Sequence, residues 1–244
     1  MTGKEKISQL SSEEALSFYE DEADHVPIFG SLREISLAEN IMHVLPESFE
    51  SIIDVGCGEG YLLHQINERY NKKEIYGLDL TSGRIAATKR NIPSAKLLRG
   101  NIYKLPFPNN SFDVVVCSEL IEHLTNYKDA IKELLRISKK SVIITVPNEQ
   151  ELVKVMCPKC KTKHYYDGHV NQFSEDKLNN IFRAKNECNI TSLRKFHTIY
   201  TYNKLTLKLP KFLRLLLDQA AHKLHKKITF LKPNYLLITV EKKQ

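Results

Sequence analysis

Three glycines at alternate positions give the clearest chemical signal in this sequence. Gly56, Gly58 and Gly60 follow an apolar run that contains Asp54, and Cys57 lies among them. Glycine lets the backbone turn sharply and approach a ligand closely, and a helix that starts there points free N–H groups at that ligand. The spacing G-x-G-x-G differs from the G-x-G-x-x-G of NAD sites. The loop therefore predicts a polar ligand other than NAD.

A carboxylate partner for this loop ends the next apolar run, at Asp79. In nucleoside-binding sheets a carboxylate at that place accepts both ribose hydroxyls. The pair formed by the loop and Asp79 therefore favours a nucleoside-like ligand over a glycine-rich turn with no function.

A second group of reactive side chains follows the apolar run 112–117 and consists of Ser118, Glu119, Glu122 and His123. Ligands of open α/β sheets bind at the carboxyl ends of strands, which places this group beside the ligand. A carboxylate or an imidazole there could take a proton from an O–H or N–H acceptor. We therefore expect Glu122 and His123 to be catalytic, and Ser118 and Glu119 to touch the bound ligand. The alternative is that Glu122 and His123 only cap the next helix.

A third group has the pattern C-x2-C-x3-H-x4-H and consists of Cys157, Cys160, His164 and His169. Two thiolates from one turn and two imidazoles supply the four tetrahedral ligands of Zn²⁺. The spacing predicts a structural zinc site of the knuckle type. A loop without metal and a redox pair are the alternatives, although no thioredoxin-like unit surrounds the cysteines.

Short β-rich runs alternate with amphipathic stretches through the middle of the chain, and the strand runs are continuously apolar. This pattern predicts a parallel sheet covered by helices on both faces. We expect strands at 51–55, 74–80, 96–99, 112–117, 141–146, 190–196, 204–209 and 234–240. Helices are expected at 61–70, 82–90, 127–138 and 174–183, the last capped by Ser174.

The domain organisation follows from where this rhythm starts and stops. Residues 1–46 show helical periodicity and form an N-terminal helical cap, and residues 47–244 form the main domain. Residues 147–173, rich in Cys, His, Lys and Tyr, interrupt the domain as an inserted loop.

The net charge of +7 is concentrated in residues 204–232, which alone carry +7, so the remainder is neutral. Within this segment 211–228 forms an amphipathic helix with one apolar and one basic face. In one interpretation, this helix packs its apolar face on the sheet or covers the ligand pocket as a lid. In two others it binds an anionic membrane surface or an anionic substrate, nucleic acid being less favoured because few aromatic residues are interleaved.

No signal peptide and no apolar run long enough to span a membrane are recognisable. Five cysteines without an export signal indicate reduced thiols. We expect a cytoplasmic protein, with peripheral membrane association through 204–232 as the variant.

Around the glycine loop the sequence resembles the class I S-adenosylmethionine-dependent methyltransferases. Asp54, Gly56, Gly58 and Gly60 match the family's first motif, and Asp79 matches the acid after the second strand. The resemblance covers roughly residues 45–150 and is specific for the cofactor, S-adenosylmethionine. It implies a Rossmann-like, seven-stranded, mostly parallel sheet with helices on both faces and an antiparallel last strand.

The family's third-strand motif matches residues 97–102, with one departure. Asn101 stands where the family has an acid that meets the adenine amino group, and its amide oxygen can accept the same hydrogen bond without the charge. By the resemblance, Leu80 and Ile102 also line the cofactor site. A subset of bacterial and archaeal methyltransferases carries a similar C-P-x-C…H…H-x-x-x-F insertion.

The segment Glu119-x-x-Glu122-His123 resembles many methyltransferases, including O-methyltransferases of the ubiquinone pathway. The resemblance implies methyl transfer to oxygen or nitrogen of a small molecule, a lipid precursor or a glycan precursor. The same segment resembles small-RNA 2′-O-methyltransferases, in which it would bind Mg²⁺ or Mn²⁺ together with His169. That interpretation competes with zinc for His169. The third alternative is a zinc-stabilised module that binds the cofactor without catalysis.

Overall fold

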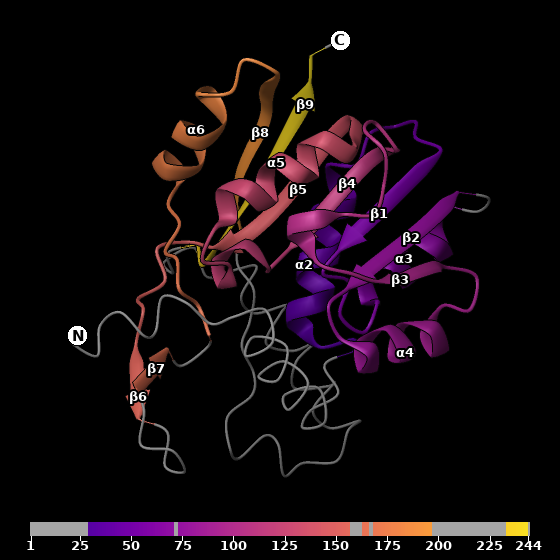
Figure 1. Ribbon diagram of the computed structural model, residues 1–244, viewed down its shortest axis with the longest axis horizontal. Coiled ribbons are helices and arrows are strands. Elements are labelled where there is room, and N and C mark those ends of the chain that lie inside the picture. Colours follow the sequence, from indigo (N-terminus) through magenta and orange to yellow (C-terminus); the bar gives the residue numbers. More distant parts are fainter. Residues whose placement is uncertain (1–28, 71–72, 157–162, 166–167, 197–232, 244) are drawn as a thin grey trace, which may run out of the picture.

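The computed structural model describes residues 29–70, 73–156, 163–165, 168–196 and 233–243 (Figure 1). The helices are Leu32–His43 (α2), Tyr61–Arg69 (α3), Ser82–Asn91 (α4), Tyr127–Ile137 (α5) and Glu175–Arg183 (α6), with short 3₁₀ turns at Ile102–Lys104 (η1) and Ile121–His123 (η2). The strands are Ser51–Val55 (β1), Glu74–Asp79 (β2), Lys96–Arg99 (β3), Phe112–Ser118 (β4), Ser138–Pro147 (β5), Lys154–Met156 (β6), Lys163–Tyr165 (β7), Cys188–Phe196 (β8) and Tyr235–Lys242 (β9).

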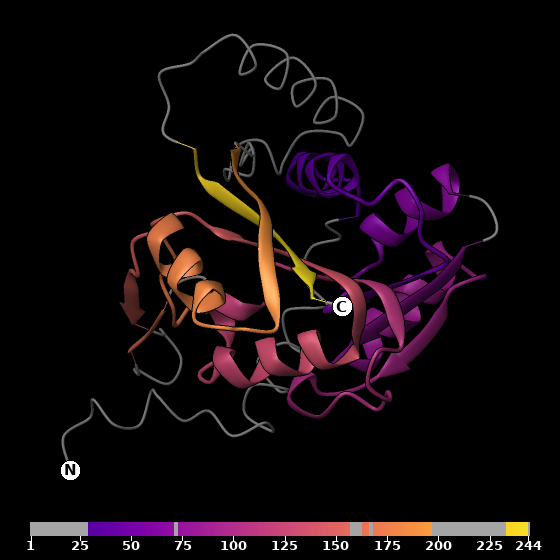
Figure 2. The same ribbon diagram turned by 90° about the horizontal axis from the view of Figure 1, so that it is seen from above.

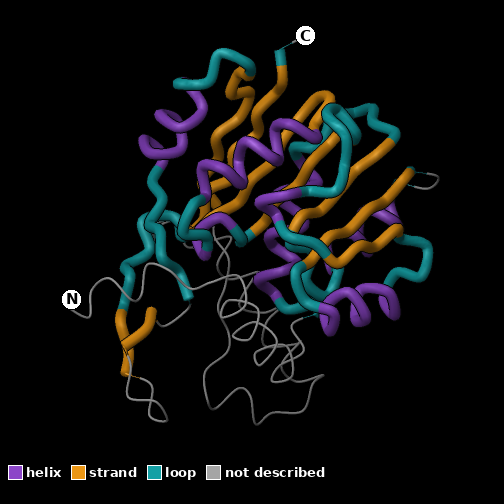
Figure 3. Tube along the Cα trace, in the orientation of Figure 1, coloured by secondary structure: helices purple, strands orange, loops and turns teal. Residues whose placement is uncertain are grey.

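Seven of these strands form one sheet in the order β3-β2-β1-β4-β5-β9-β8 (Figure 3). The first five strands in that order run parallel to one another. The last strand, β9, lies antiparallel between β5 and β8. The predicted α/β fold, a seven-stranded, mostly parallel sheet with an antiparallel final strand, is confirmed.

Helices cover both faces of the sheet, because successive side chains of a buried strand point to opposite faces. In β1, Ile53 belongs to the apolar cluster under α5 and α6, whereas Ile52 belongs to the cluster under α2 and α3. β4 divides in the same way between Val115 and Val114. Figure 2 shows α2 and α5 on opposite sides of the sheet. This double burial explains why β1 and β4 have apolar side chains on both faces.

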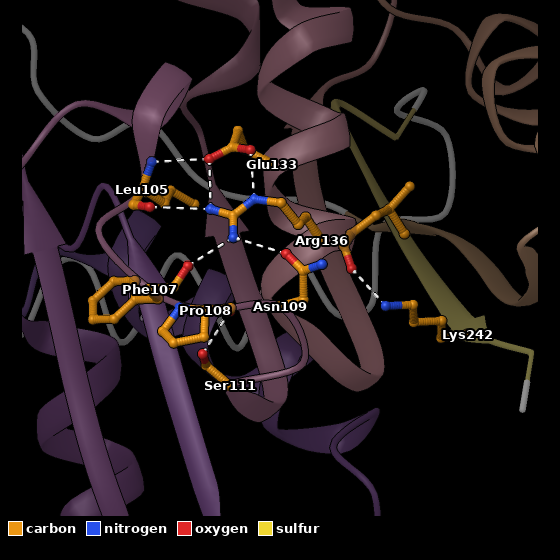
Figure 4. A network of polar contacts seen from close by, with 9 residues as sticks. Leu105, Phe107, Pro108, Asn109, Ser111, Glu133, Arg136 and Lys242 are labelled. Carbon is orange, nitrogen blue, oxygen red and sulfur yellow. Dashed lines mark hydrogen bonds and ion pairs between the residues drawn. The ribbon is translucent and has the colours of Figure 1, made fainter.

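An arginine of α5 fixes the loop that leads into β4 (Figure 4). Arg136 donates from Nη1 to the carbonyl of Phe107 at 2.7 Å and from Nη2 to the carbonyl of Leu105 at 3.0 Å. Glu133 pairs with Arg136 at 2.6 Å and also accepts from the N–H of Leu105 at 2.9 Å. The guanidinium fork thus satisfies loop carbonyls that no strand reaches.

The segment 147–173 contains more structure than the loop that the sequence predicts. β6 and β7 pair antiparallel in a separate two-stranded sheet that lies away from the main sheet in Figure 1. Each of the two strands is only three residues long, which is too short for a periodic pattern to be recognised in the sequence. After the hairpin, Ser174 caps α6 by accepting from the N–H of Lys177 at 3.2 Å, as predicted.

Several expectations fall on other parts of the chain. The strand 204–209, the basic helix 211–228 and most of the cap 1–46 lie outside the described residues, and α2 is the described part of that cap. The division into domains therefore stays a prediction. Within the described residues no helix has the length and apolar character required to cross a membrane.

Candidate active site at the carboxyl edge of the sheet

The carboxyl ends of β1 to β5 meet along one edge, and the strand order changes direction between β1 and β4. Open α/β sheets bind ligands at such a switch point. Gly56 follows β1 and lies against Leu120, which follows β4: a Cβ built on Gly56 would be 2.8 Å from Leu120 Cδ2. The glycine loop and the segment after β4 therefore meet at the edge where a ligand is expected.

All three loop glycines have positive φ, at 88° for Gly56, 56° for Gly58 and 84° for Gly60. Residues other than glycine rarely adopt that backbone conformation. At Gly60 space is also lacking, because a Cβ would lie 2.5 Å from Thr88 Cγ2. The alternation of glycines thus follows from backbone geometry and from the packing of the loop on α4.

Hydrogen bonds hold the loop against β2. The N–H groups of Gly56 and Cys57 both donate to the carbonyl of Leu78, at 2.7 and 3.1 Å, and the N–H of Gly58 donates to Asp79 Oδ2 at 3.0 Å. The thiol of Cys57 is buried in the cluster under α2 and α3, so its contribution to a ligand site would come from its backbone. Three backbone N–H groups of the loop thus fix its shape against β2.

Asp79 also accepts from Thr81 through Oδ1, from the N–H at 3.0 Å and from the hydroxyl at 3.2 Å. An ionised carboxylate offers about four acceptor sites, so three bonds from the protein leave capacity for a ligand hydroxyl. Because Asp79 is buried, with 7% exposure, we expect its remaining acceptor site to serve a ligand bound at the loop.

Asp54, in β1, is more deeply buried than Asp79, and its Oδ1 has no hydrogen-bond partner among the described residues. Burial, with the charge of Asp79 as a second cause, raises the pKa of Asp54 to about 7. Two neighbouring carboxyl groups, one of them with an unpaired oxygen, favour a ligand that brings positive charge or hydrogen-bond donors.

The third strand contributes a polar residue near the same edge. Asn101 Oδ1 accepts from the N–H of Tyr103 at 2.9 Å and so starts the turn η1, while Ile102 is buried behind it. The carbonyl of Leu80 accepts from Arg99 Nε at 3.0 Å. The amide oxygen of Asn101 retains a second lone pair, so its predicted contact with an adenine amino group stays compatible with this geometry.

Ser118, the last residue of β4, and Glu119, which follows it, contact different parts of the protein. Ser118 Oγ lies 2.7 Å from Thr145 Oγ1 of β5. Glu119 adopts a positive φ of 52° and its Oε2 lies 2.6 Å from Arg33 of α2. Arg33 Nε also donates to the hydroxyl of Tyr235 in β9 at 3.0 Å. Burial raises the pKa of Glu119 and the Arg33 charge opposes that rise.

The start of α2 is tied to both sides of the switch point. Arg33 reaches the segment after β4, and the N–H of Phe29 donates to Glu59 Oε2 of the glycine loop at 3.0 Å. The Phe29 ring packs edge-on against Tyr61 at 5.2 Å. Phe29 and Arg33 are not predicted from the sequence, because nothing in their local pattern distinguishes them from other residues at the start of a helix.

Glu122 and His123 lie in the turn η2, before α5, so they do not cap that helix; Asn126 is its N-cap residue. Glu122 has 0% exposure, and both of its carboxylate oxygens lack hydrogen-bond partners among the described residues. Burial, followed by the charge of Glu119, raises the pKa of Glu122 well above its usual range. Burial lowers the pKa of His123 to about 3, so this imidazole is neutral at physiological pH.

His169 joins these two residues from the far end of the hairpin segment. Its ring meets the ring of His123 edge-on at 4.5 Å, and its Nε2 lies 4.0 Å from Glu122 Oε1. Its Nδ1 lies 2.8 Å from Gln150 Oε1. Of the two metal sets that compete for His169, the structure thus brings together three members of the Glu119–Glu122–His123–His169 set, with Glu119 turned to Arg33.

The zinc set cannot be followed in the same way. Cys157 and Cys160 lie outside the described residues, and of His164 the backbone is described, in β7. The zinc site therefore stays a prediction.

Comparisons with known proteins find similarity over the part of the chain that contains these site residues. Residues 53–146 match the family model of the methyltransferase domain. A probable S-adenosylmethionine-dependent methyltransferase of Mycolicibacterium smegmatis is 30% identical over 99 residues, which are 40% of this chain and 38% of that protein. A ubiquinone/menaquinone biosynthesis C-methyltransferase of Campylobacter jejuni is 24% identical over 153 residues, which are 60% of this chain and 64% of that protein. The chain thus spans less than two thirds of either relative.

The fold is also that of solved methyltransferases. The complex between the Haloferax volcanii Trm112 methyltransferase activator and a putative methyltransferase contains a chain that superposes with a TM-score of 0.61 at 16% identity, covering 95% of this chain and 97% of that one. Residues 53–146 thus match a methyltransferase domain in sequence, and the described part of the chain has the fold of solved methyltransferase chains.

Proposed function

We propose that this protein transfers a methyl group from S-adenosylmethionine to an oxygen or nitrogen atom of a small molecule, with lipid and glycan precursors included. The observation that carries the proposal is the hydrogen bond from Gly58 to Asp79, which fixes the glycine loop at the switch point next to a carboxylate with remaining acceptor capacity. The methyltransferase family match over the same residues supports it.

The charge pattern of the site fits this cofactor. S-adenosylmethionine is a sulfonium that also carries an ammonium group, and it supplies an electrophilic methyl group when bound. Asp54, with an unpaired buried oxygen beside Asp79, offers negative charge to such a cation. In this assignment Asp79 accepts the ribose hydroxyls, Asn101 accepts from the adenine amino group, and the glycine loop supplies backbone contacts.

Methyl transfer from a sulfonium is an in-line displacement, so the protein mainly has to align the acceptor and exclude water. Glu122, which is buried, and His123, which is half-buried, follow β4 beside the proposed cofactor site and are our candidates for contacting the acceptor. A relative named as a C-methyltransferase shows that carbon acceptors occur among similar proteins. The acceptor atom is therefore the part of the proposal that most needs a test.

The direct test is transfer of a labelled methyl group into fractions of a cell extract, with small molecules, lipids and RNA separated afterwards. Label in a small-molecule or lipid fraction that is lost with Asp79→Ala supports the proposal. Label in RNA would favour the 2′-O-methyltransferase alternative. Label in none of the fractions, although S-adenosylmethionine binds, would indicate the non-catalytic module.

Contact with anionic membranes or anionic substrates through residues 204–232 is a separate proposal, supported by the net charge of +7 in that segment. Co-sedimentation with anionic and with neutral vesicles tests it. Binding to anionic vesicles that falls with added salt is the expected result for a membrane surface.

A further inference from the structure

We propose that Glu122, His123 and His169 bind a divalent transition-metal cation, such as Zn²⁺, and that Gln150 positions His169 for it. The candidate ligand atoms of the three residues all lie within 4.8 Å of one another. The metal-binding claim stands apart from methyl transfer, while a role of the metal in holding the acceptor rests on the proposed function.

Glu122 provides one argument for this cation. A fully buried carboxylate whose two oxygens both lack hydrogen-bond partners among the described residues is costly unless a cation or a proton compensates it. Arg33, the nearby cation, is engaged at 2.6 Å by Glu119 and not by Glu122. A metal ion between Glu122 and the two imidazoles would supply the missing charge and fill the unused coordination sites.

The fold builds this cluster from two segments that are distant in the sequence. The N–H groups of Val170 and Asn171 donate to the carbonyl of Glu122 at 2.9 and 3.0 Å. Asn171 Nδ2 donates to the carbonyl of Leu124 at 2.6 Å. These bonds hold the residues next to His169 on the turn η2, so the position of the imidazole beside Glu122 is fixed by backbone contacts.

The contact with Gln150 sets the tautomer of His169. An amide oxygen is an acceptor, so Gln150 Oε1, 2.8 Å from His169 Nδ1, places the ring proton on Nδ1. The lone pair of Nε2 then points toward the side on which Glu122 lies, at 4.0 Å. Histidines that bind metals commonly donate their second ring N–H to such an acceptor, which sets the ring orientation.

The ligand chemistry decides the class of metal. Two imidazoles and one carboxylate form the protein set of catalytic Zn²⁺ sites and suit other first-row transition metals, whereas Mg²⁺ prefers oxygen ligands. In a tetrahedral site with metal–ligand bonds of about 2.0–2.2 Å, two ligand atoms lie about 3.3–3.6 Å apart. His169 and Glu122, at 4.0 Å, and the ligand atoms separated by up to 4.8 Å must therefore move closer by roughly 0.5–1.5 Å when the ion binds. Three protein ligands leave a position open for an acceptor oxygen.

The experiment measures binding of Zn²⁺ and Co²⁺ to the full chain by equilibrium dialysis with elemental analysis. It uses Cys157→Ser/Cys160→Ser as the background, so that a cysteine site does not contribute. About one ion per chain is expected, with a Co²⁺ spectrum free of sulfur-to-metal charge transfer. His169→Ala should lose this ion, whereas His43→Ala, which changes an exposed histidine of α2, should keep it.

Two variants of Gln150 test the positioning role. Gln150→Met should weaken binding about 10–100-fold because the tautomer is no longer set, and Gln150→Glu should retain it. Calorimetric binding of S-adenosylmethionine to each variant reports whether the fold is intact and tests the proposed function separately. An absence of metal from the cysteine-free background, or equal binding by His169→Ala, would overturn the metal site even if S-adenosylmethionine binds normally.

Discussion

Arg33 Nη2 lies 2.6 Å from Glu119 Oε2 and joins the first turn of α2 to the carboxyl end of β4. The two residues are 86 positions apart in the chain. Glu119 is buried, with a side-chain exposure of 9%, so its negative charge depends on this arginine. The N-terminal helix is therefore part of the site.

Replacement of Arg33 by Met should lower the free energy of unfolding by about 1–3 kcal/mol, since it leaves Glu119 as an unpaired buried charge. Adding Glu119→Gln to Arg33→Met should restore part of that loss, because the amide carries no charge. Urea unfolding of the two single variants and the double variant measures the coupling between the two residues. Strictly additive effects would show that the ion pair contributes nothing.

Asp54 gives the site a pH dependence whose sign can be stated. Burial raises its pKa in the folded protein to about 7, above the ordinary 3.8. Between these values the folded state holds a proton that the unfolded state has released, so stability falls as the pH rises through this range. Asp54→Asn should remove this component and be more stable than the wild type at pH 8 by ~2–4 kcal/mol, with a smaller difference at pH 4.

The same residue should link pH to cofactor binding. Above pH 7 the ionised Asp54 attracts a cationic ligand, so the affinity of the wild type for S-adenosylmethionine should increase from pH 6 to pH 8. The variant Asp54→Asn should lack this increase. Thermal melting and calorimetric titration at several pH values check both statements, and a parallel pH profile in the two proteins would contradict the second.

The fold was predictable from the sequence because its signals are local. The apolar run 112–117 is buried on both faces, and the glycine loop is constrained in φ. Each of these properties leaves a sequence pattern within a few residues. β5 nevertheless begins at Ser138, earlier than the predicted 141, because it pairs with β4 around a register shift. Strand ends depend on such pairing, which apolar periodicity does not report.

The candidate site was predictable in part. Asp54, Asp79 and the glycines follow from motif spacing, since β1, the glycine loop, α3 and β2 are consecutive in the chain. His169 reaches Glu122 through a hairpin and bonds from Val170 and Asn171, and Gln150 has no local signature. The sequence alone left His169 shared between two metal sets, because only the folded chain shows which side chains meet.

Replacement of Gly60 by Ala tests the packing of the loop, and the same replacement at Gly83 is its control. Gly60 has a φ of 84° and no room for a Cβ beside Thr88, whereas Gly83 has open space in α4. Gly60→Ala should destabilise the protein by roughly 1–3 kcal/mol and weaken cofactor binding. Gly83→Ala should stabilise it by about 0.5–1 kcal/mol. Chemical denaturation of both variants checks the contrast, which a similar loss in each would contradict.

Calorimetric titration with S-adenosylmethionine tests the central claim most directly. Asp113, a buried carboxylate of β4 that accepts from the backbone N–H of Glu50 at 2.7 Å, supplies the control for loss of a buried acid. We predict binding of one equivalent to the wild type and to Asp113→Asn, and at least about tenfold weaker binding to a folded Asp79→Ala, which lacks the hydroxyl acceptor. No binding to the wild type, or equal binding to Asp79→Ala, would contradict the account.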